Sequence, residues 1–188
     1  METRDIEMEK LYFESIKKAG SRMEDLARSM YAGFVLTDYT VYKQAEQAAG
    51  PAVARKVHKN ARLQYVSWII KDAFEDFRIG EVKEKDVPTV GRITRRIYER
   101  TSCPFVIKED AADRFVGVVL RCPIVAFSMG LFDLDLGCPY HQSLAEVCQA
   151  SLSELVKQLG QSEYLEAVQD KFICKGDEYC QVIIQRKT

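Results

Sequence analysis

The chain has 188 residues, of which 47% are hydrophobic and 29% charged, and its formal net charge is −1. This length and composition predict one globular domain over residues 1–188 and exclude a disordered chain. Because the charge is close to zero and no apolar run approaches the roughly 20 residues that span a bilayer, we expect neither nucleic acid nor a membrane as a partner.

Helical patterns fill residues 1–100. Apolar residues recur at helical spacing over residues 6–18 and 23–49. Gly50 and Pro51 suit the end of one helix and the first turn of the next, which the pattern extends to about residue 77. The long apolar stripes on these helices need a covering surface, which predicts a homodimer as well as packing within the chain.

A shorter helix is predicted over residues 90–100, after a charged loop at residues 81–86. Its Glu99 can pair with Arg95 or Arg96 along one face, which favours a solvated surface. The alternative is a clamp for a carboxylate or phosphate, in which Arg96 would bind substrate.

The periodicity changes in residues 101–188. Strands are predicted at 105–108, 114–122, 164–174 and 179–185, with an amphipathic helix from 139 to 160 between the two pairs. Gly117 predicts a weak point or bulge in the second strand. Residues 124–136 are apolar without a clear period, and no element is predicted there. The order predicts an α+β fold in which a helical N-terminal half packs on a four-stranded antiparallel sheet with a long C-terminal-half helix.

The start of that long helix carries the best candidate for chemistry. Pro139 suits the first helical position, which makes Cys138 the N-cap, where the helix dipole favours a thiolate. His141 lies three residues further on and can reach the same turn, so the pair predicts a nucleophile and its base. The alternative is that Cys138 only caps and packs while His141 bonds to the backbone.

The cysteines allow a second kind of site. The charged N-terminus lacks a secretory signal, which predicts a reducing cytoplasmic location, where metal binding, catalysis and burial compete as roles for thiols. Cys174 and Cys180 face each other across a hairpin if residues 176–178 form its turn, whereas a register shifted by one residue separates them. Cys148 lies on an apolar stripe, which favours burial in the core as an alternative to metal binding. The candidate ligands of a zinc ion or iron–sulfur cluster are Cys122, Cys138, Cys148, Cys174 and Cys180.

The sequence also predicts a role for Arg121 and a position for His58. Arg121 follows a predicted strand beside Cys122 and could bind the carboxylate of a ligand. His58 lies in a polar helical stretch and is expected at the surface.

The C-terminal pattern resembles the L-2-amino-thiazoline-4-carboxylate hydrolase family over roughly residues 109–186. The resemblance is carried by Arg-Cys-Pro after a valine-rich strand, Gly-Cys-Pro-Tyr-His, Cys148, and Lys-Gly-Asp-x-x-Cys before the last strand. It implies water-dependent opening of a cyclic C=N bond, with Cys122, Cys138, Cys148 and Cys180 as the cysteine positions of the family.

The same pattern is similar to the broader 4-vinyl reductase, or hydrocarbon-binding, domains. Some sensor members hold zinc with cysteines and a glutamate three residues before the hairpin cysteine, where this chain has Lys171. Two functions are therefore expected of a pocket between the sheet and the long helix. The first is a hydrolase with Cys138 as nucleophile, His141 as base, and Arg121, Arg96 and Tyr140 binding substrate. The second is a ligand-binding or sensor module with cysteine-bound zinc or an iron–sulfur cluster.

Overall fold

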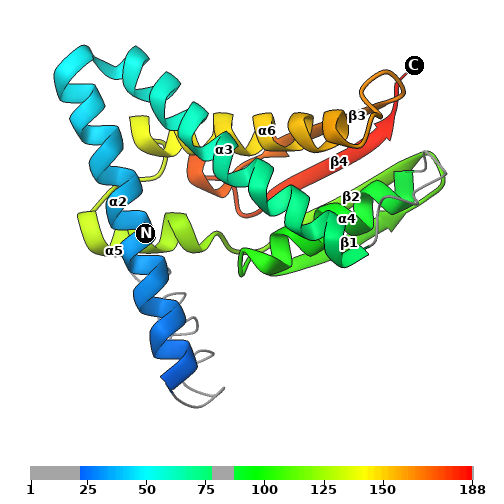
Figure 1. The fold of residues 1–188 in the computed structure, drawn as a ribbon, viewed down its shortest axis with the longest axis horizontal. Helices are drawn as coiled ribbons and strands as arrows, with labels where there is room; N and C mark the ends of the chain where they lie inside the picture. The colour runs from blue at the N-terminus through cyan, green and yellow to red at the C-terminus, as the bar shows by residue number, and fades with distance from the viewer. Residues whose placement is uncertain (1–21, 78–86, 188) are drawn as a thin grey trace.

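The computed structural model describes residues 22–77 and 87–187. Apart from one helix and one short 3-10 turn that were not predicted, its helices and strands follow the predicted order (Figure 1). The helices are α2 (Arg22–Ala49), α3 (Pro51–Phe77), α4 (Val87–Arg100), α5 (Pro123–Phe132), α6 (Pro139–Gln158) and the 3-10 turn η2 (Ile173–Lys175), and the strands are β1 (Phe105–Asp110), β2 (Arg114–Val119), β3 (Leu165–Lys171) and β4 (Cys180–Arg186). This confirms the α+β class. The helix predicted over residues 6–18 and the loop over 81–86 lie outside the described residues.

The sheet has the strand order β1-β2-β4-β3, and each neighbouring pair is antiparallel. Helix α4 packs on β1, β2 and β4, while α6 packs on β3. Helix α3 packs on both α4 and α6, and α2 in turn packs on α3 and α5. Figure 1 shows α3 crossing the molecule in front of α6 and the sheet, with α2 at one end. Every helix within the described ranges is too short or too polar to cross a bilayer.

Two glycines let aromatic rings of the main core approach the backbone. A Cβ at Gly91 of α4 would lie 2.3 Å from the ring of Phe115, and one at Gly117 of β2 would lie 1.9 Å from the ring of Phe105. Gly117 was predicted to mark a bulge, but it pairs in register with Val182, and the irregularity lies in β1 instead. The absent side chain at Gly117 therefore makes room for a ring.

Helix α5 occupies a stretch for which the sequence predicted no element. It runs from Pro123 to Phe132, and its C-cap Asp133 adopts the left-handed conformation and donates its N–H to the carbonyl of Met129. The helix is apolar on every side, and Val125 and Phe127 are buried. A helix that is apolar all round has no stripe, so periodicity cannot detect it.

The predicted final hairpin is modified at its turn. Strand β3 ends at Lys171, and the chain then forms η2 and a turn closed by Gly176 at φ +103°. Cys174 therefore lies in η2, whereas Cys180 begins β4 and pairs with Val119 of β2. The condition under which Cys174 and Cys180 would face each other, a hairpin turn at residues 176–178, is not met, because the 3-10 turn removes Cys174 from the strand.

Candidate functional site

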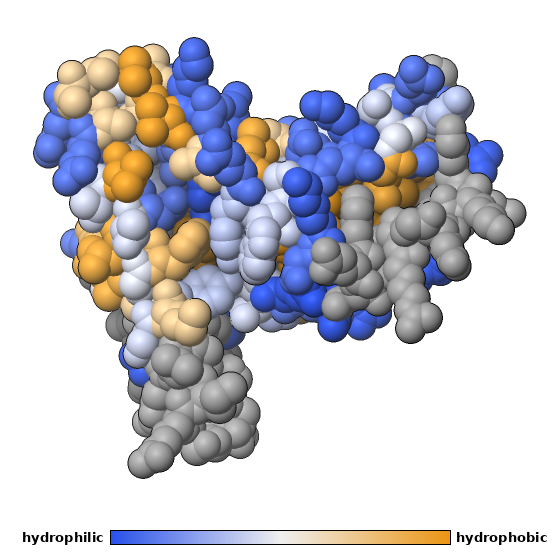
Figure 2. All heavy atoms as spheres, in the orientation of Figure 1, coloured by the Kyte–Doolittle hydropathy of each residue, from blue (hydrophilic) through white to orange (hydrophobic). Residues whose placement is uncertain are grey.

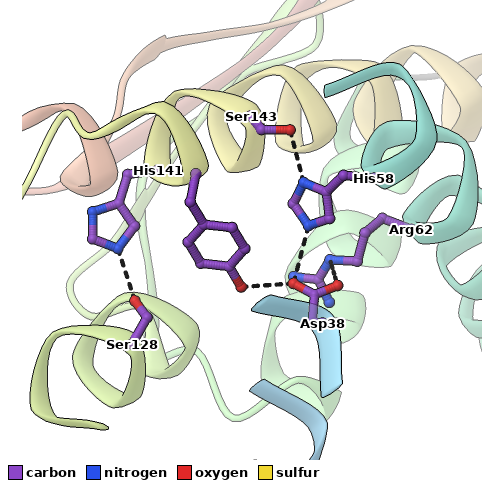
Figure 3. A network of polar contacts seen from close by, with 7 residues as sticks. Asp38, His58, Arg62, Ser128, His141 and Ser143 are labelled. Atoms are coloured by element: carbon purple, nitrogen blue, oxygen red, sulfur yellow. Dashed lines mark hydrogen bonds and ion pairs between the residues drawn. The ribbon is translucent and has the colours of Figure 1, made fainter. Parts of the chain in front are cut away.

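A buried polar network joins α2, α3 and α6 (Figure 3). The ring of His58 lies between two partners, with Nδ1 2.7 Å from Ser143 Oγ and Nε2 3.0 Å from Asp38 Oδ2. The hydroxyl of Tyr140 donates to the same Asp38 oxygen at 2.6 Å. Arg62 lies on the other side of the carboxylate, with Nε 3.5 Å from Oδ1. Three segments that are distant in sequence thus share one carboxylate.

The surface position predicted for His58 is wrong, because the residue is only 1% exposed. Its polar neighbours in sequence suggested solvent, but the ring faces a carboxylate and a hydroxyl contributed by other helices. A polar side chain is tolerated inside a protein when such partners satisfy it.

The charge of Asp38 is maintained inside the protein. Burial acts to raise the pKa of Asp38, but the hydrogen bond from His58 and the positive charge of Arg62 outweigh it and hold that pKa below its ordinary value. Burial and the adjacent Asp38 charge raise the pKa of Tyr140, so its hydroxyl remains a donor. The guanidinium of Arg62 also lies 4.7 Å from the ring centre of Phe34.

Ser143, His58 and Asp38 are the residue types of a hydrolytic triad. Ser143 is completely buried within α6, and His58 is almost so. Their hydrogen bonds join α2, α3 and α6 and hold Tyr140 in place.

His141 has its own partners. Its Nδ1 lies 2.8 Å from the carbonyl oxygen of Asp135, and its Nε2 lies 2.7 Å from Ser128 Oγ (Figure 3). Since a carbonyl can only accept, Nδ1 carries the proton of the neutral ring and Nε2 accepts from Ser128. Burial lowers the pKa of His141 despite the bond to Asp135, which favours this neutral form. Its basic nitrogen is directed at Ser128, so the role of His141 as base to Cys138 stays a prediction.

An open crevice of about 90 Å³ lies at the N-terminus of α6. Cys138 is the N-cap of this helix and Pro139 its first residue, as predicted. Apolar and aromatic groups form most of the walls, and the ion pair between Lys43 and Glu46, 2.6 Å apart, also contributes. The lining residues are Tyr39, Tyr42, Lys43, Glu46, Leu134, Cys138, Pro139 and Tyr140.

Tyr42 is the unusual member of this crevice. The residue is 1% exposed, and its hydroxyl has no hydrogen-bond partner among the residues that the structure describes. Its ring contacts His58 and Tyr140 edge-on, at centroid separations of 5.6 and 5.5 Å. Tyr140 therefore belongs both to the crevice and to the polar network. Tyr42, whose ring packs against that of Tyr140, forms another part of the crevice wall.

The two predicted arginines lie elsewhere. Arg96 is on the exposed face of α4 and lies 4.0 Å from Glu99, which Arg95 approaches to 2.7 Å, and this confirms a solvated face. Arg121 is partly buried between β2 and α5. Neither arginine lines the crevice, whereas Tyr140, the third predicted substrate-binding residue, does.

The six cysteines are all free thiols. Burial raises the pKa of Cys103, Cys122, Cys174 and Cys180, and it raises that of Cys148 to about 12. In the part of the chain that the structure describes, which includes every cysteine, no group of three or more His, Cys, Asp or Glu residues could hold a metal ion. The predicted zinc or iron–sulfur ligands Cys122, Cys138, Cys148, Cys174 and Cys180 thus gain no support from the geometry.

Sequence reasoning missed Asp38, Tyr42, Arg62 and Ser143. One local signal was present, because His58 and Arg62 are four residues apart and share a helix face with buried Ala54. That spacing indicates two polar side chains directed inward.

Comparison with known proteins shows that the fold of this chain is similar to that of a solved structure. No protein-family model matches the chain, and no curated protein matches it. A crystal structure of trafficking protein particle complex subunit 3 from Naegleria fowleri, covalently bound to palmitic acid, superposes with a TM-score of 0.53 at 12% identity, covering 86% of this chain and 97% of that one. The Fe(II) unliganded H-NOX protein from K. algicida and a point mutant of it give TM-scores of 0.34 and 0.36 at 13% and 12% identity, covering 70% of this chain and 64% of theirs. The first similarity extends over nearly the whole of both chains and concerns the fold alone.

Proposed function

We propose that this protein is a small-molecule-binding module whose ligand enters the crevice at the N-terminus of α6. The observation that carries the proposal is the crevice itself, with its aromatic walls and the buried hydroxyl of Tyr42, which has no partner within residues 22–77 and 87–187. Ligand sites are typically concave and largely apolar, with a few placed polar groups that fix the orientation of the ligand. A ligand larger than 90 Å³ can project from the open mouth.

The fold similarity supports this class of function. The trafficking-complex subunit, whose fold is similar, was crystallised with palmitic acid covalently attached. That fold can therefore accommodate an apolar ligand, and the tyrosine-lined crevice offers this chain a place for an apolar or aromatic body.

A neutral aromatic probe tests the proposal. We expect benzyl alcohol to bind with a dissociation constant of about 1 mM, as is usual for so few atoms, and to shift the backbone amide resonances of Cys138 and Tyr140. The variant Leu134→Trp fills the crevice and should abolish these shifts. Leu136→Trp is the matched control, because Leu136 is exposed and does not line the crevice. The proposal fails if benzyl alcohol leaves the crevice resonances unchanged, or if both variants bind it equally.

The second candidate is the hydrolase predicted from the sequence, which opens a cyclic C=N bond. It is supported by the position of Cys138, which lines the crevice at a helix N-terminus. His141 would have to exchange its bond with Ser128 to act as the base. L-2-Amino-thiazoline-4-carboxylate is the substrate to assay, and Cys138→Ser should abolish its turnover. Absence of turnover by the unmodified protein would refute this candidate.

Homodimerisation is a further part of the proposed function. Figure 2 shows hydrophobic side chains on the surface where α2 runs into α3. Val41 of α2 and Val53 and Val57 of α3 are exposed. Exposed apolar groups of this kind favour association with a second surface. Light scattering should give twice the chain mass for the unmodified protein and the chain mass for Val57→Lys. A monomeric unmodified protein would contradict the dimer.

A further inference from the structure

We infer that the crevice takes its ligand by a carboxylate group, which binds the open N-terminus of α6 and accepts a hydrogen bond from the hydroxyl of Tyr42. This inference rests on the proposed ligand-binding function and specifies the chemical class of the ligand.

The first reason is the uncapped start of α6. The first backbone N–H groups of a helix have no acceptor within the helix, and a polar N-cap side chain usually satisfies one of them. Here Cys138 makes no capping hydrogen bond, and Pro139 has no N–H. The N–H groups of Tyr140 and His141 are thus the first donors of a 20-residue helix, at its positive end.

The second reason is independent and lies on the facing helix. The hydroxyl of Tyr42 is buried without a partner among the described residues, and leaving such a group unsatisfied is unfavourable. Tyr42 lines the crevice, and edge contacts with His58 and Tyr140 hold its ring in place. Tyr42 lines the same crevice as Pro139 and Tyr140, the first two residues of α6, which gives a bound acceptor donors on two sides.

The charges around the crevice permit an anion. Glu46 is the acidic residue among those lining it, and its carboxylate is paired with Lys43 at 2.6 Å. Asp38, deeper in the protein, already has Tyr140, His58 and Arg62 around it. The remaining field at the crevice is that of the helix N-terminus, which attracts negative charge.

The number of donors selects a carboxylate rather than a phosphate. The N–H of Tyr140 and the hydroxyl of Tyr42 match the two oxygens of a carboxylate, whereas a phosphate presents more oxygens and more charge than these donors balance. The aromatic and aliphatic walls, including Tyr39 and Leu134, suit an apolar body attached to that carboxylate.

The experiment compares three probes on the ¹⁵N-labelled full-length chain, using the amide resonances of Tyr140 and His141. Benzoate carries the carboxylate, benzyl alcohol is a neutral aromatic of similar size, and inorganic phosphate is an anion without an apolar body. We expect benzoate to bind about tenfold more tightly than benzyl alcohol and to shift both amides downfield, because charge-assisted hydrogen bonds are stronger. Phosphate should bind more weakly than benzoate.

Two variant pairs locate the carboxylate. Tyr42→Phe removes only the hydroxyl and should reduce the preference for benzoate over benzyl alcohol about fivefold. Tyr65→Phe, on the exposed face of α3, should keep that preference. Cys138→Asp supplies a carboxylate cap of its own and should bind benzoate at least about tenfold more weakly than Cys138→Ala, which leaves the N–H groups open.

Each result has a distinct meaning. Equal affinity for benzoate and benzyl alcohol would overturn the inference and leave the proposed binding function intact. No shift at the crevice with either aromatic probe would overturn the proposed function. Phosphate binding more tightly than benzoate would overturn the carboxylate class, and equal benzoate binding by Cys138→Asp and Cys138→Ala would overturn the role of the helix N-terminus.

Discussion

The hydroxyl of Tyr140 donates a hydrogen bond of 2.6 Å to Asp38, which lies 102 residues earlier in the chain. Tyr140 also lines the crevice, so one side chain belongs both to the interior polar network and to the candidate ligand site. The geometry of the crevice wall therefore depends on a carboxylate that the ligand does not touch.

Removing the Tyr140 hydroxyl measures the strength of this connection. Tyr140→Phe keeps the ring and leaves Asp38 with one donor fewer, which should lower the free energy of unfolding by about 1.5–3 kcal/mol. Urea denaturation measures the change. Tyr65→Phe is the control and should shift the free energy by less than about 0.5 kcal/mol, because Tyr65 is 44% exposed. Equal effects of the two substitutions would show that the bond to Asp38 contributes nothing.

Asp38→Asn should make the protein less stable at neutral pH by about 3–5 kcal/mol, since it leaves the buried Arg62 without its opposite charge. The difference from the unmodified protein should shrink on acidification. The pKa of Asp38 in the folded state lies below its ordinary value, so the unfolded chain takes up the proton first as the pH falls. The stabilisation is complete above about pH 4–5 and is lost as the pH falls through the folded pKa.

Urea denaturation of both proteins at several pH values between about 6 and 3 tests this pH dependence. Glu163→Gln, at an exposed position, is the control and should follow the unmodified protein throughout. A difference between Asp38→Asn and the unmodified protein that stays constant with pH would contradict the assignment.

The cysteines should differ in the rate at which their thiols react with an aromatic disulfide reagent. Burial raises the pKa of Cys148 to about 12, which lowers its thiolate fraction near pH 8 roughly a thousandfold relative to an ordinary thiol. Cys138 lines the open crevice, so we expect one fast thiol in the native protein and six after denaturation. Cys138→Ser should remove the fast phase. A fast phase that survives this substitution would assign the exposed thiol to another residue.

Gly117 and Gly33 should respond to alanine in opposite directions. Gly117→Ala places a methyl group against the ring of Phe105 and should lower the free energy of unfolding by about 1–3 kcal/mol. Gly33 lies in α2 with open space around it, so Gly33→Ala should raise the free energy by about 0.5–1 kcal/mol. Combining Gly117→Ala with Phe105→Leu should cost less than the sum of the single changes. Additive effects would indicate that the ring is not what Gly117 accommodates.

Local patterns predicted most of the helices and strands. Helix α6 and its N-cap at Cys138 followed from Pro139 and an apolar stripe, and the strands followed from alternation or, in β2, from the β-branched and aliphatic residues of a buried strand. Helix α5 lacked a polar face and was missed for that reason. Strand β3 ends before Cys174 because the chain forms a 3-10 turn closed by Gly176. The alternation of polar and apolar residues does not predict such a turn.

The candidate site was less accessible to sequence reasoning. Cys138 and Tyr140 were identified because they belong to a distinctive short run at a helix start. Asp38 and Ser143 could not be, because their common partner His58 lies 20 residues from one and 85 from the other. Contacts at such separations are set by how α2, α3 and α6 pack, and a single sequence does not display them.

The polar network draws residues from both halves of the chain, so it cannot form until most of the chain has been synthesised. Asp38, His58 and Arg62 leave the ribosome before Tyr140 and Ser143, and Ser143 follows His58 by 85 residues. At about 5–20 residues per second, that interval lasts roughly 4–17 s. During this time the helices that carry Asp38 and His58 have no α6 to dock on, and the inner face of their hairpin is open to water and to chaperones.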